Sequence, residues 1–335
     1  MFKENLIKSG WLHALFIAVI AYPLGAVSAS LLATVMQTNI LVYSVVFTIS
    51  AAVALLLRAG PGKLGLNTLK SYQTWLYALL QISVLIFGIL IMKYVSATEG
   101  AGLYRVTGLV AVFLSYIFLA QKTNSFELAG SLLILAGFGS IIYYTDISFS
   151  IQLLLIFFVL ARALSQSLQK LIVEIHKTNN QAKSSKDEAR VIGFILAISG
   201  VLMLFVLLIV AYIKQNYSIA LFAKFPNYSD FADLKGFSMA IFMGFCIVSI
   251  SKYCEFYAGK TIGAKYLTTL LSLQIIFVYF IEQVLAYFGL MNPVGFVFND
   301  YIAVGLILSG NFIISLSGFI KDFNFNQKAV KIKSG

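Results

Sequence analysis

Residues 191–213, VIGFILAISGVLMLFVLLIVAYI, form a long apolar run that contains no charged residue. A helix of about 20 such residues crosses the ~30 Å hydrocarbon core of a lipid bilayer. The run lacks the alternation and the ~10-residue length that are typical of transmembrane β-strands. It therefore predicts a transmembrane helix.

The composition of the whole chain agrees with this prediction. Of 335 residues, 60% are hydrophobic and 11% are charged, and the mean hydropathy is +0.91. A soluble domain carries roughly 25% charged residues, so the composition excludes a soluble enzyme, a disordered protein and a nucleic-acid binder. The two cysteines and two histidines supply neither a disulfide framework nor a metal-ligand set.

Similar apolar runs recur along the chain, and we expect an all-α integral membrane protein with ten transmembrane helices. The expected spans are residues 11–36, 40–57, 75–94, 100–120, 128–144, 150–169, 191–213, 236–256, 263–288 and 300–320.

The distribution of basic residues predicts the orientation in the membrane. With a cytoplasmic N-terminus, 17 of the 24 Lys and Arg residues lie in cytoplasmic segments, 4 in outer segments and 3 within spans. Cytoplasmic segments of membrane proteins carry such an excess. We therefore place both termini in the cytoplasm, with 321–335 as a basic cytoplasmic tail, and a bacterial inner membrane is the favoured location.

Two short matches suggest an internal repeat. YVSATEGA at 94–101 can be aligned with YAGKTIGA at 257–264, and LILAG at 133–137 with LILSG at 306–310. Both matches place spans three to five on spans eight to ten. Because five is an odd number, the second repeat must be inverted, which is a transporter architecture with a substrate site near mid-membrane. The expected repeats are 1–144 and 145–320.

The same stretches carry a resemblance to a known family. KYVSATEGAGLYRVTGLVAVFLSYIFLAQKTNSFELAGSLLILAGFGSI at 93–141 resembles the third-to-fifth-helix signature of EamA-type members of the drug/metabolite transporter superfamily. YAGKTIGAKYLTTLLSLQIIFVYFIEQVL at 257–285 and GLILSG at 305–310 resemble the corresponding part of the second repeat. The resemblance implies a cavity lined mainly by helices three, four, eight and nine. The chain departs from the pattern in its long 214–235 segment and its extended sixth helix.

Ionisable residues inside the spans are candidates for a site, because each costs about 2.5 kcal/mol or more at the bilayer centre. Arg105 is expected either to hold an anionic group in the cavity or to pair with Glu99. Lys252 and Glu255 are three apart, share a helix face and can pair, either to couple substrate or proton binding to opening or as a structural pair. Lys265, at the start of helix nine, is either an anion ligand or a solvated loop residue.

Other residues are weaker candidates for the substrate or proton site. Glu282 is a second candidate proton site or an interfacial acid. Pro23 and Gly25 weaken helix one and form a candidate gating hinge or a static kink. Further candidate ligands are neutral: Gln81, Gln274, Tyr104, Tyr266 and Tyr22.

Two regions are read as peripheral. Arg162 is expected near the cytoplasmic end of helix six, reaching for lipid headgroups, with cavity lining as the alternative. The polar segment 170–190 is expected to be a mobile cytoplasmic loop. The 214–235 segment either lies flat at the outer interface or is an ordinary extracellular loop.

The sequence therefore predicts a secondary transporter. The absence of a nucleotide-binding motif leaves an ion gradient or exchange as the energy source. We expect a small polar or amphipathic metabolite, amino-acid-like or nucleotide-like and anionic or zwitterionic, moved by alternating access in a monomer or homodimer, with no cofactor and no nucleic-acid partner. The alternatives are a carrier for drugs or cations, a membrane enzyme using Asp230 and Asp233, or an accessory subunit.

Overall fold

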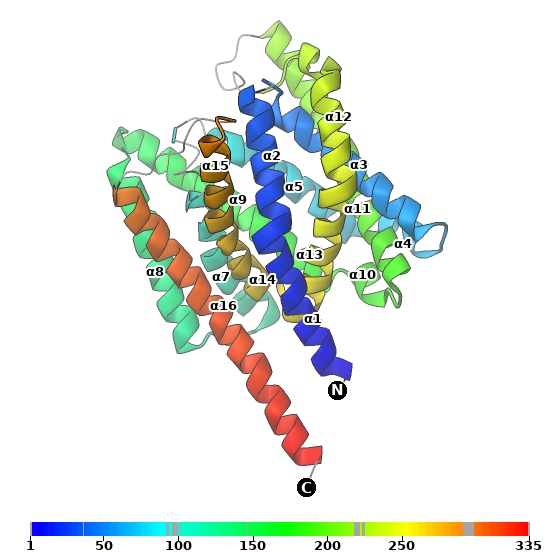
Figure 1. Cartoon of the computed structure of the whole chain (residues 1–335), viewed down its shortest axis with the longest axis vertical. Coiled ribbons are helices and arrows are strands. Elements are labelled where there is room, and N and C mark those ends of the chain that lie inside the picture. The colour runs from blue at the N-terminus through cyan, green and yellow to red at the C-terminus, as the bar shows by residue number, and fades with distance from the viewer. Residues whose placement is uncertain are drawn as a thin grey trace.

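The fold was examined in a computed structural model, which describes residues 2–35, 37–91, 94–95, 100, 102–145, 147–217, 222, 225–290 and 298–333. This described part is helical and contains no β-strand. The helices pack side by side as a bundle, with both termini at the same end (Figure 1). The prediction of an all-helical chain is confirmed.

The elements of the first half are α1 (Phe2–Phe16), η1 (Ile17–Ala21), α2 (Tyr22–Val35), α3 (Ile40–Ala59), α4 (Leu64–Lys70), α5 (Tyr72–Ile91), η2 (Tyr104–Val106), α7 (Thr107–Leu119) and α8 (Ser125–Tyr144). Those of the second half are α9 (Phe149–Ile175), α10 (Lys177–Gln181), α11 (Ser185–Asn216), η4 (Tyr228–Ala232), α12 (Leu234–Met243), η5 (Gly244–Val248), α13 (Ser249–Ile262), α14 (Ala264–Leu270), η6 (Leu271–Leu273), α15 (Gln274–Tyr287) and α16 (Phe298–Lys333).

Nine helical stretches in the described residues are long and apolar enough to cross a membrane. The fourth expected span is represented by η2 and α7, which together cover Tyr104–Leu119 and are shorter than the other nine. Part of the loop before them, including Glu99, lies outside the described residues. The structure thus supports a membrane protein, and the tenth span stays a prediction.

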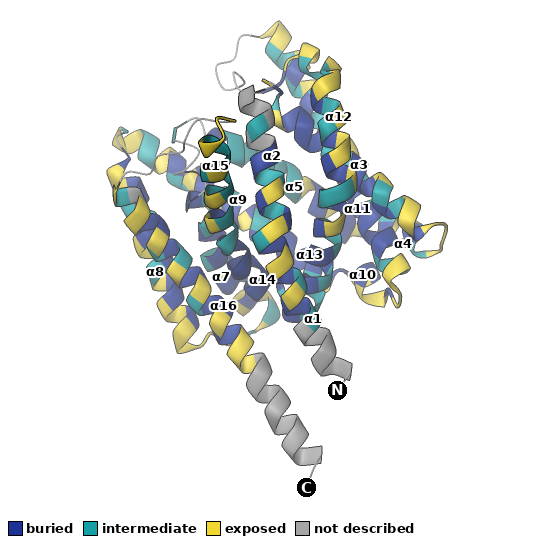
Figure 2. Ribbon diagram, viewed as in Figure 1, coloured by how far each residue is buried: buried dark blue, intermediate teal, exposed yellow. Residues whose placement is uncertain are grey.

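The surface of the bundle fits a lipid environment. Figure 2 shows exposed positions along the outward faces of the helices and buried ones between them. Many exposed positions hold large apolar side chains, such as Leu57, Phe113 and Phe205, which are 70%, 61% and 62% exposed. Soluble monomers expose much less apolar surface in large patches, so side chains of this kind along the outward faces fit a lipid environment.

Capping side chains set where several helices begin. The Asn124 side chain accepts from the Glu127 amide at 2.8 Å and the Glu127 carboxylate accepts from the Asn124 amide, a capping box that starts α8. Asn39 caps α3 in the simpler manner, accepting from the Leu41 amide at 3.0 Å. Between α13 and α14, Gly263 has φ +89°, a conformation that favours glycine.

Helices from the two halves of the chain are paired. α8 packs along α16, which Figure 1 shows running side by side, and α3 packs along α11. α7 contacts α14, α5 contacts α9 and α1 contacts α13. The α8–α16 approach is close: a Cβ atom at Gly130 would lie 2.5 Å from the Gly310 carbonyl oxygen, and one at Gly137 would lie 2.5 Å from the Ala303 carbonyl oxygen. Small residues permit this packing in membrane helices.

Two expectations about the middle of the chain are wrong. The segment 170–190 is not a loop, because α9 continues to Ile175 and α10 and α11 follow at once. Lys170 therefore lies inside the bundle, with a side chain 3% exposed. Arg162 does not reach outward to headgroups but lies over the ring of Tyr104. The helix continues because its apolar stripe, which includes Leu171 and Ile175, continues beyond the polar residues that suggested a loop.

The C-terminal basic segment also extends a helix. α16 runs from Phe298 through Lys333, so most of the expected tail, 321–335, continues the last span as helix.

Candidate functional site

A cavity of about 300 Å³ lies within the bundle. Its walls come from the first half (η1, α2, α3 and α5) and from the second half (α11, α12, η5, α13 and α15). The lining residues are Ala21, Tyr22, Gly25, Ala26, Tyr43, Ser44, Phe47, Thr48, Gln81, Leu196, Ser199, Met243, Val248, Ser251, Lys252 and Gln274. Polar side chains, such as those of Gln81, Lys252 and Gln274, stand among apolar ones in this lining, and small-molecule sites combine the two kinds.

Two π-helical segments border this cavity. η1 ends where the Tyr22 amide donates to the Ile17 carbonyl, and η5 ends where the Ser249 amide donates to the Gly244 carbonyl. Such wide turns are local irregularities found at functional sites. Pro23 lies two residues after η1, and Gly25 has open space where a side chain would lie. Of the two candidate hinge residues, Gly25 lines the cavity, whereas Pro23 lies beside the irregular stretch of helix and is not among the lining residues.

A buried ionic cluster is centred on Glu255, which is 0% exposed. Its carboxylate accepts from Lys252 at 2.9 Å, one helical turn before it on α13. It also accepts from Lys170 on α9 and from the Tyr22 hydroxyl. The expected Lys252–Glu255 pair is present, and Lys170 is a partner that the sequence did not suggest. Lys252 lines the cavity, so this cluster adjoins it.

The two candidate amides also line the cavity. Gln81 on α5 accepts from the amide of Gln169 on α9, and Gln274 is the first residue of α15. Gln81 is thus held by a neighbouring helix as well as facing the cavity.

Two arginines lie beside this region. The guanidinium carbon of Arg162 lies 3.4 Å from the ring centroid of Tyr104, and its Nη1 donates to Gln166 at 3.0 Å. Arg105 Nη1 donates to the Leu271 carbonyl at 3.3 Å. Arg105 and Tyr104 are not among the residues that line the cavity. In the described residues neither arginine forms an ion pair, and the Nε atom of each is buried without a hydrogen-bond partner.

Lys265 lies in a separate buried cluster. Its Nζ is 2.7 Å from Glu127, and the two side chains are 4% and 1% exposed. Tyr266 donates to the same carboxylate at 3.2 Å. These contacts join α14 to α8, and neither Lys265 nor Tyr266 lines the cavity.

The remaining carboxylates are placed as follows. Glu282 lies in the second half of α15 and is partly exposed. Asp233 caps α12, accepting from Thr38 at 2.7 Å and from the Gly236 amide at 3.1 Å; the Thr38 hydroxyl and that amide hold the pKa of Asp233 below its usual value. Asp230 accepts from Asn39 at 3.3 Å and belongs to a capping box.

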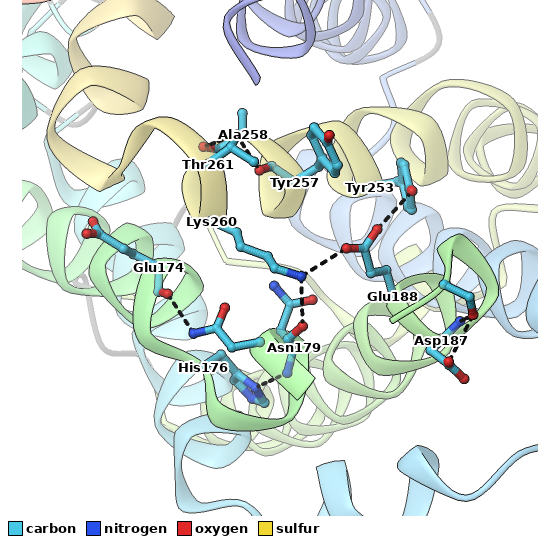
Figure 3. A network of polar contacts seen from close by, with 12 residues as sticks. Glu174, His176, Asn179, Asp187, Glu188, Tyr253, Tyr257, Ala258, Lys260 and Thr261 are labelled. Carbon is cyan, nitrogen blue, oxygen red and sulfur yellow. Dashed lines mark hydrogen bonds and ion pairs between the residues drawn. The ribbon is translucent and has the colours of Figure 1, made fainter. Parts of the chain in front are cut away.

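A polar network joins three helices at the end of the bundle that carries the termini. Glu188 on α11 accepts from Lys260 at 3.1 Å and from Tyr253 at 3.0 Å, both on α13. Lys260 also donates to the Asn179 carbonyl at 3.3 Å (Figure 3). We call Glu188, Tyr253, Lys260 and Asn179 the lower network. It lies near the N-terminus, since Gly10 of α1 packs against Thr261.

Comparison with known proteins bears on the fold. No family model matches the chain, and no curated protein matches it. A solved structure described only as "Crystal structure of protein" superposes with a TM-score of 0.55 at 17% identity, covering 93% of this chain and 98% of that one. At this identity the likeness concerns the fold alone, and it extends over nearly the whole of both chains.

Proposed function

We propose that the protein is a secondary active transporter that moves a small polar or amphipathic metabolite by alternating access. The observation that carries the proposal is the cavity between the two halves of the chain, which includes Lys252 and adjoins a buried ionic cluster. Charged groups inside a membrane protein are costly and mark pathways for ions or substrates. On the resemblance described above, it would be an EamA-type member of the drug/metabolite transporter superfamily with ten spans.

The pairing of helices supports two inverted repeats. At the offset of 173 that aligns 133–137 with 306–310, Gly130 corresponds to Ala303 and Gly137 to Gly310. Gly130 approaches Gly310, and Gly137 approaches Ala303. A two-fold relation between the halves requires this reciprocity, as in a symmetric interface where i contacts j and j contacts i.

The other helix pairs are consistent with the same relation. Under the exchange of halves, α3 corresponds to α11 and α7 to α14, and each of these pairs is in contact. The contact of α5 with α9 corresponds to that of α13 with α1, and both occur. These helix contacts come from the packing alone and do not depend on the short sequence matches.

Alternating access requires the cavity to be closed at one side and free to open. In this proposal, the ionic cluster of Glu255 and the lower network block the route from the cavity toward the termini. The π-helical segments η1 and η5, with Pro23, offer places where the helices can bend. We propose that the terminal side is cytoplasmic, as the basic residues predict.

The charges favour an anionic or zwitterionic metabolite, because cations outnumber carboxylates around the cavity. Glu255 is the candidate for proton coupling, since its protonation would release Lys252 and Lys170 from their common partner. Glu282, farther along α15, is the second candidate.

The alternative of an enzyme is less well supported. It requires Asp230 and Asp233 as free catalytic carboxylates, but both accept hydrogen bonds that hold helix ends and the 37–39 segment in place.

Two experiments test the proposal. In the first, purified protein in proteoliposomes is offered labelled amino acids, nucleotides and quaternary amines, with and without a pH gradient. We expect saturable uptake of an anionic or zwitterionic compound, absent from protein-free vesicles. Uptake that never saturates and is not competed by unlabelled compound would contradict a carrier.

The second experiment needs no knowledge of the substrate. Cys246 and Cys254 are replaced by serine, and the cavity residue Ser251 by cysteine, in vesicles of known orientation. Because the cavity opens alternately, a membrane-impermeant maleimide should label Ser251→Cys from either side. A cysteine in place of Ser131, buried on α8, is the control and should stay unlabelled. Labelling of Ser251→Cys from one side only would contradict alternating access.

A further inference from the structure

Arg105 and Arg162 lie inside the bundle, and no residue that the structure describes supplies a counter-charge to either. No carboxylate lies within ion-pair distance of either guanidinium in the described residues, and only one hydrogen bond from each is present. A guanidinium has five N–H donors, so most of the donors of both arginines are unused. The Nε atoms are buried and have no partner. Such groups cost several kcal/mol unless something pairs with them.

The neighbouring carboxylate cannot serve both arginines. Glu255 already accepts from Lys170, Lys252 and Tyr22. Among the described residues, this region therefore holds four cations, Arg105, Arg162, Lys170 and Lys252, and one carboxylate, Glu255, when all are ionised. This excess of positive charge favours an anion from outside the chain.

The arginines are held in position for such an anion. Arg162 is stacked on the ring of Tyr104, whose hydroxyl donates to the Gly88 carbonyl at 2.8 Å. Stacking on an aromatic ring fixes the plane of a guanidinium and leaves its edge free to donate. Gln166, which accepts from Arg162, also accepts from Thr107 at 3.2 Å. The side chains of η2, α7 and α9 thus fix one of the two cations.

The pair adjoins the cavity through two connections. On α9, Gln166 is one turn before Gln169, which bonds to the cavity residue Gln81. On the other side, Arg105 donates to the carbonyl of Leu271, three residues before the cavity residue Gln274. The arginines are therefore linked to the cavity wall through neighbouring residues of α9 and of the η6–α15 segment.

We propose that Arg105 and Arg162 form a subsite for the phosphoryl group of a phosphorylated metabolite. Two guanidinium groups from different helices can each donate two bonds to one tetrahedral dianion, whereas one guanidinium already fills both oxygens of a single carboxylate. The remainder of the metabolite occupies the cavity. This inference rests on the proposed transport function and narrows its substrate class.

The test measures binding and does not depend on transport. Thermal unfolding of the purified protein in neutral detergent is followed with inorganic phosphate, glycerol 3-phosphate, succinate or chloride at equal ionic strength. Glycerol 3-phosphate and phosphate should raise the Tm by about 4 °C at about 100 times their Kd. Succinate and chloride should raise it far less. Equal shifts with all four anions would overturn the phosphoryl assignment.

Variants locate the effect. Arg105→Gln and Arg162→Gln should lose the phosphate-dependent shift, while Arg58→Gln, an exposed arginine on α3, should keep it. Without ligand, Arg162→Gln should melt no lower than the wild-type protein, because an unpaired buried charge is removed. An unchanged shift in Arg162→Gln, or a lower Tm without ligand, would overturn the proposal.

A lipid headgroup offers the same phosphoryl chemistry, and nanodiscs separate the two sources. We expect the glycerol 3-phosphate shift to be the same in phosphatidylcholine discs and in discs that contain phosphatidylglycerol. If phosphatidylglycerol abolishes the shift, a lipid occupies the subsite and the metabolite assignment is wrong. Binding without uptake in proteoliposomes would contradict the transport proposal alone, whereas saturable uptake of a neutral compound that is unaffected by Arg162→Gln would contradict the subsite alone.

Discussion

Glu127 and Lys265 form a buried pair in which each charge has its partner 2.7 Å away, whereas Arg105 and Arg162 have no carboxylate among the described residues. Both clusters lie inside the same bundle and both involve helices of the two halves. A balanced pair between α8 and α14 is satisfied without a ligand and can be purely structural. An unbalanced pair is satisfied only when an anion arrives. We propose that charge balance, and not burial alone, distinguishes a packing contact from a binding site in this protein.

The largest effect is expected from removing the carboxylate that partly neutralises the centre. Glu255→Gln leaves Lys170 and Lys252 without their common partner, and the free energy of unfolding should fall by about 3 to 5 kcal/mol. Thermal unfolding in detergent measures this loss. The double variant Glu255→Gln, Lys170→Met should recover part of it, since one of the stranded cations is gone. A double variant no more stable than the single one would show that the two side chains do not act as a pair.

Breaking the Glu127–Lys265 pair should destabilise the protein somewhat less than Glu255→Gln does. Lys265→Met leaves Glu127 buried without its cation, at a cost of about 3 kcal/mol, measured in the same unfolding assay. The loss is smaller because Tyr266 and the Asn124 amide still donate to Glu127. Replacing both partners, Glu127→Leu with Lys265→Met, should restore most of the stability. If Arg162→Gln destabilised as much as Lys265→Met, the distinction between the two clusters would be lost.

A third prediction concerns how closely α8, the helix that carries Glu127, approaches α16. Gly130→Ala places a Cβ atom 2.5 Å from the Gly310 carbonyl oxygen, and such overpacking costs about 1 to 3 kcal/mol. Gly139→Ala, on the same helix with open space around the new methyl group, is the matched control and should be neutral or slightly stabilising. Chemical or thermal unfolding of the two variants compares them directly. Equal stability of the two would contradict the close contact.

The smallest effect on stability is expected in the lower network, which is balanced but partly exposed. Lys260 and Glu188 are 24% and 13% exposed, so Lys260→Gln should cost less than about 1 kcal/mol. Lys260→Gln should instead change the access of reagents to the cavity. Maleimide labelling of Ser251→Cys from the side of the termini should become faster. The rate of maleimide labelling measures this, with Lys63→Gln, an exposed residue before α4, as control. An unchanged rate would remove the lower network from the proposed gate.

Much of this fold could be predicted from the sequence because membrane helices are recognisable from the length and hydropathy of their apolar runs. The span 191–213 lies inside α11, and the three-residue spacing of Lys252 and Glu255 correctly indicated their pairing. Residues three or four positions apart on one helix share a face, so a contact between them can be predicted from a single sequence.

Contacts between distant helices could not be predicted in the same way. Lys265 meets Glu127 and Lys170 meets Glu255 only because of how the helices pack, and neither pair follows a spacing rule. The contact of Lys170 was missed for a further reason. The polar residues after 176 suggested a loop over 170–190, which placed Lys170 outside the helix although α9 continues to Ile175. The apolar stripe through Leu171 and Ile175 was the signal that the helix continued.

We propose that Arg105 and Arg162, which lack a described counter-charge, bind substrate and that the Glu127–Lys265 pair does not. This claim is tested most directly by uptake of a labelled phosphorylated metabolite into proteoliposomes, normalised to inserted protein, for two variants. We predict that Arg162→Gln abolishes saturable uptake and that Glu127→Leu with Lys265→Met retains it. Uptake retained by Arg162→Gln, or lost equally by both variants, would contradict the claim.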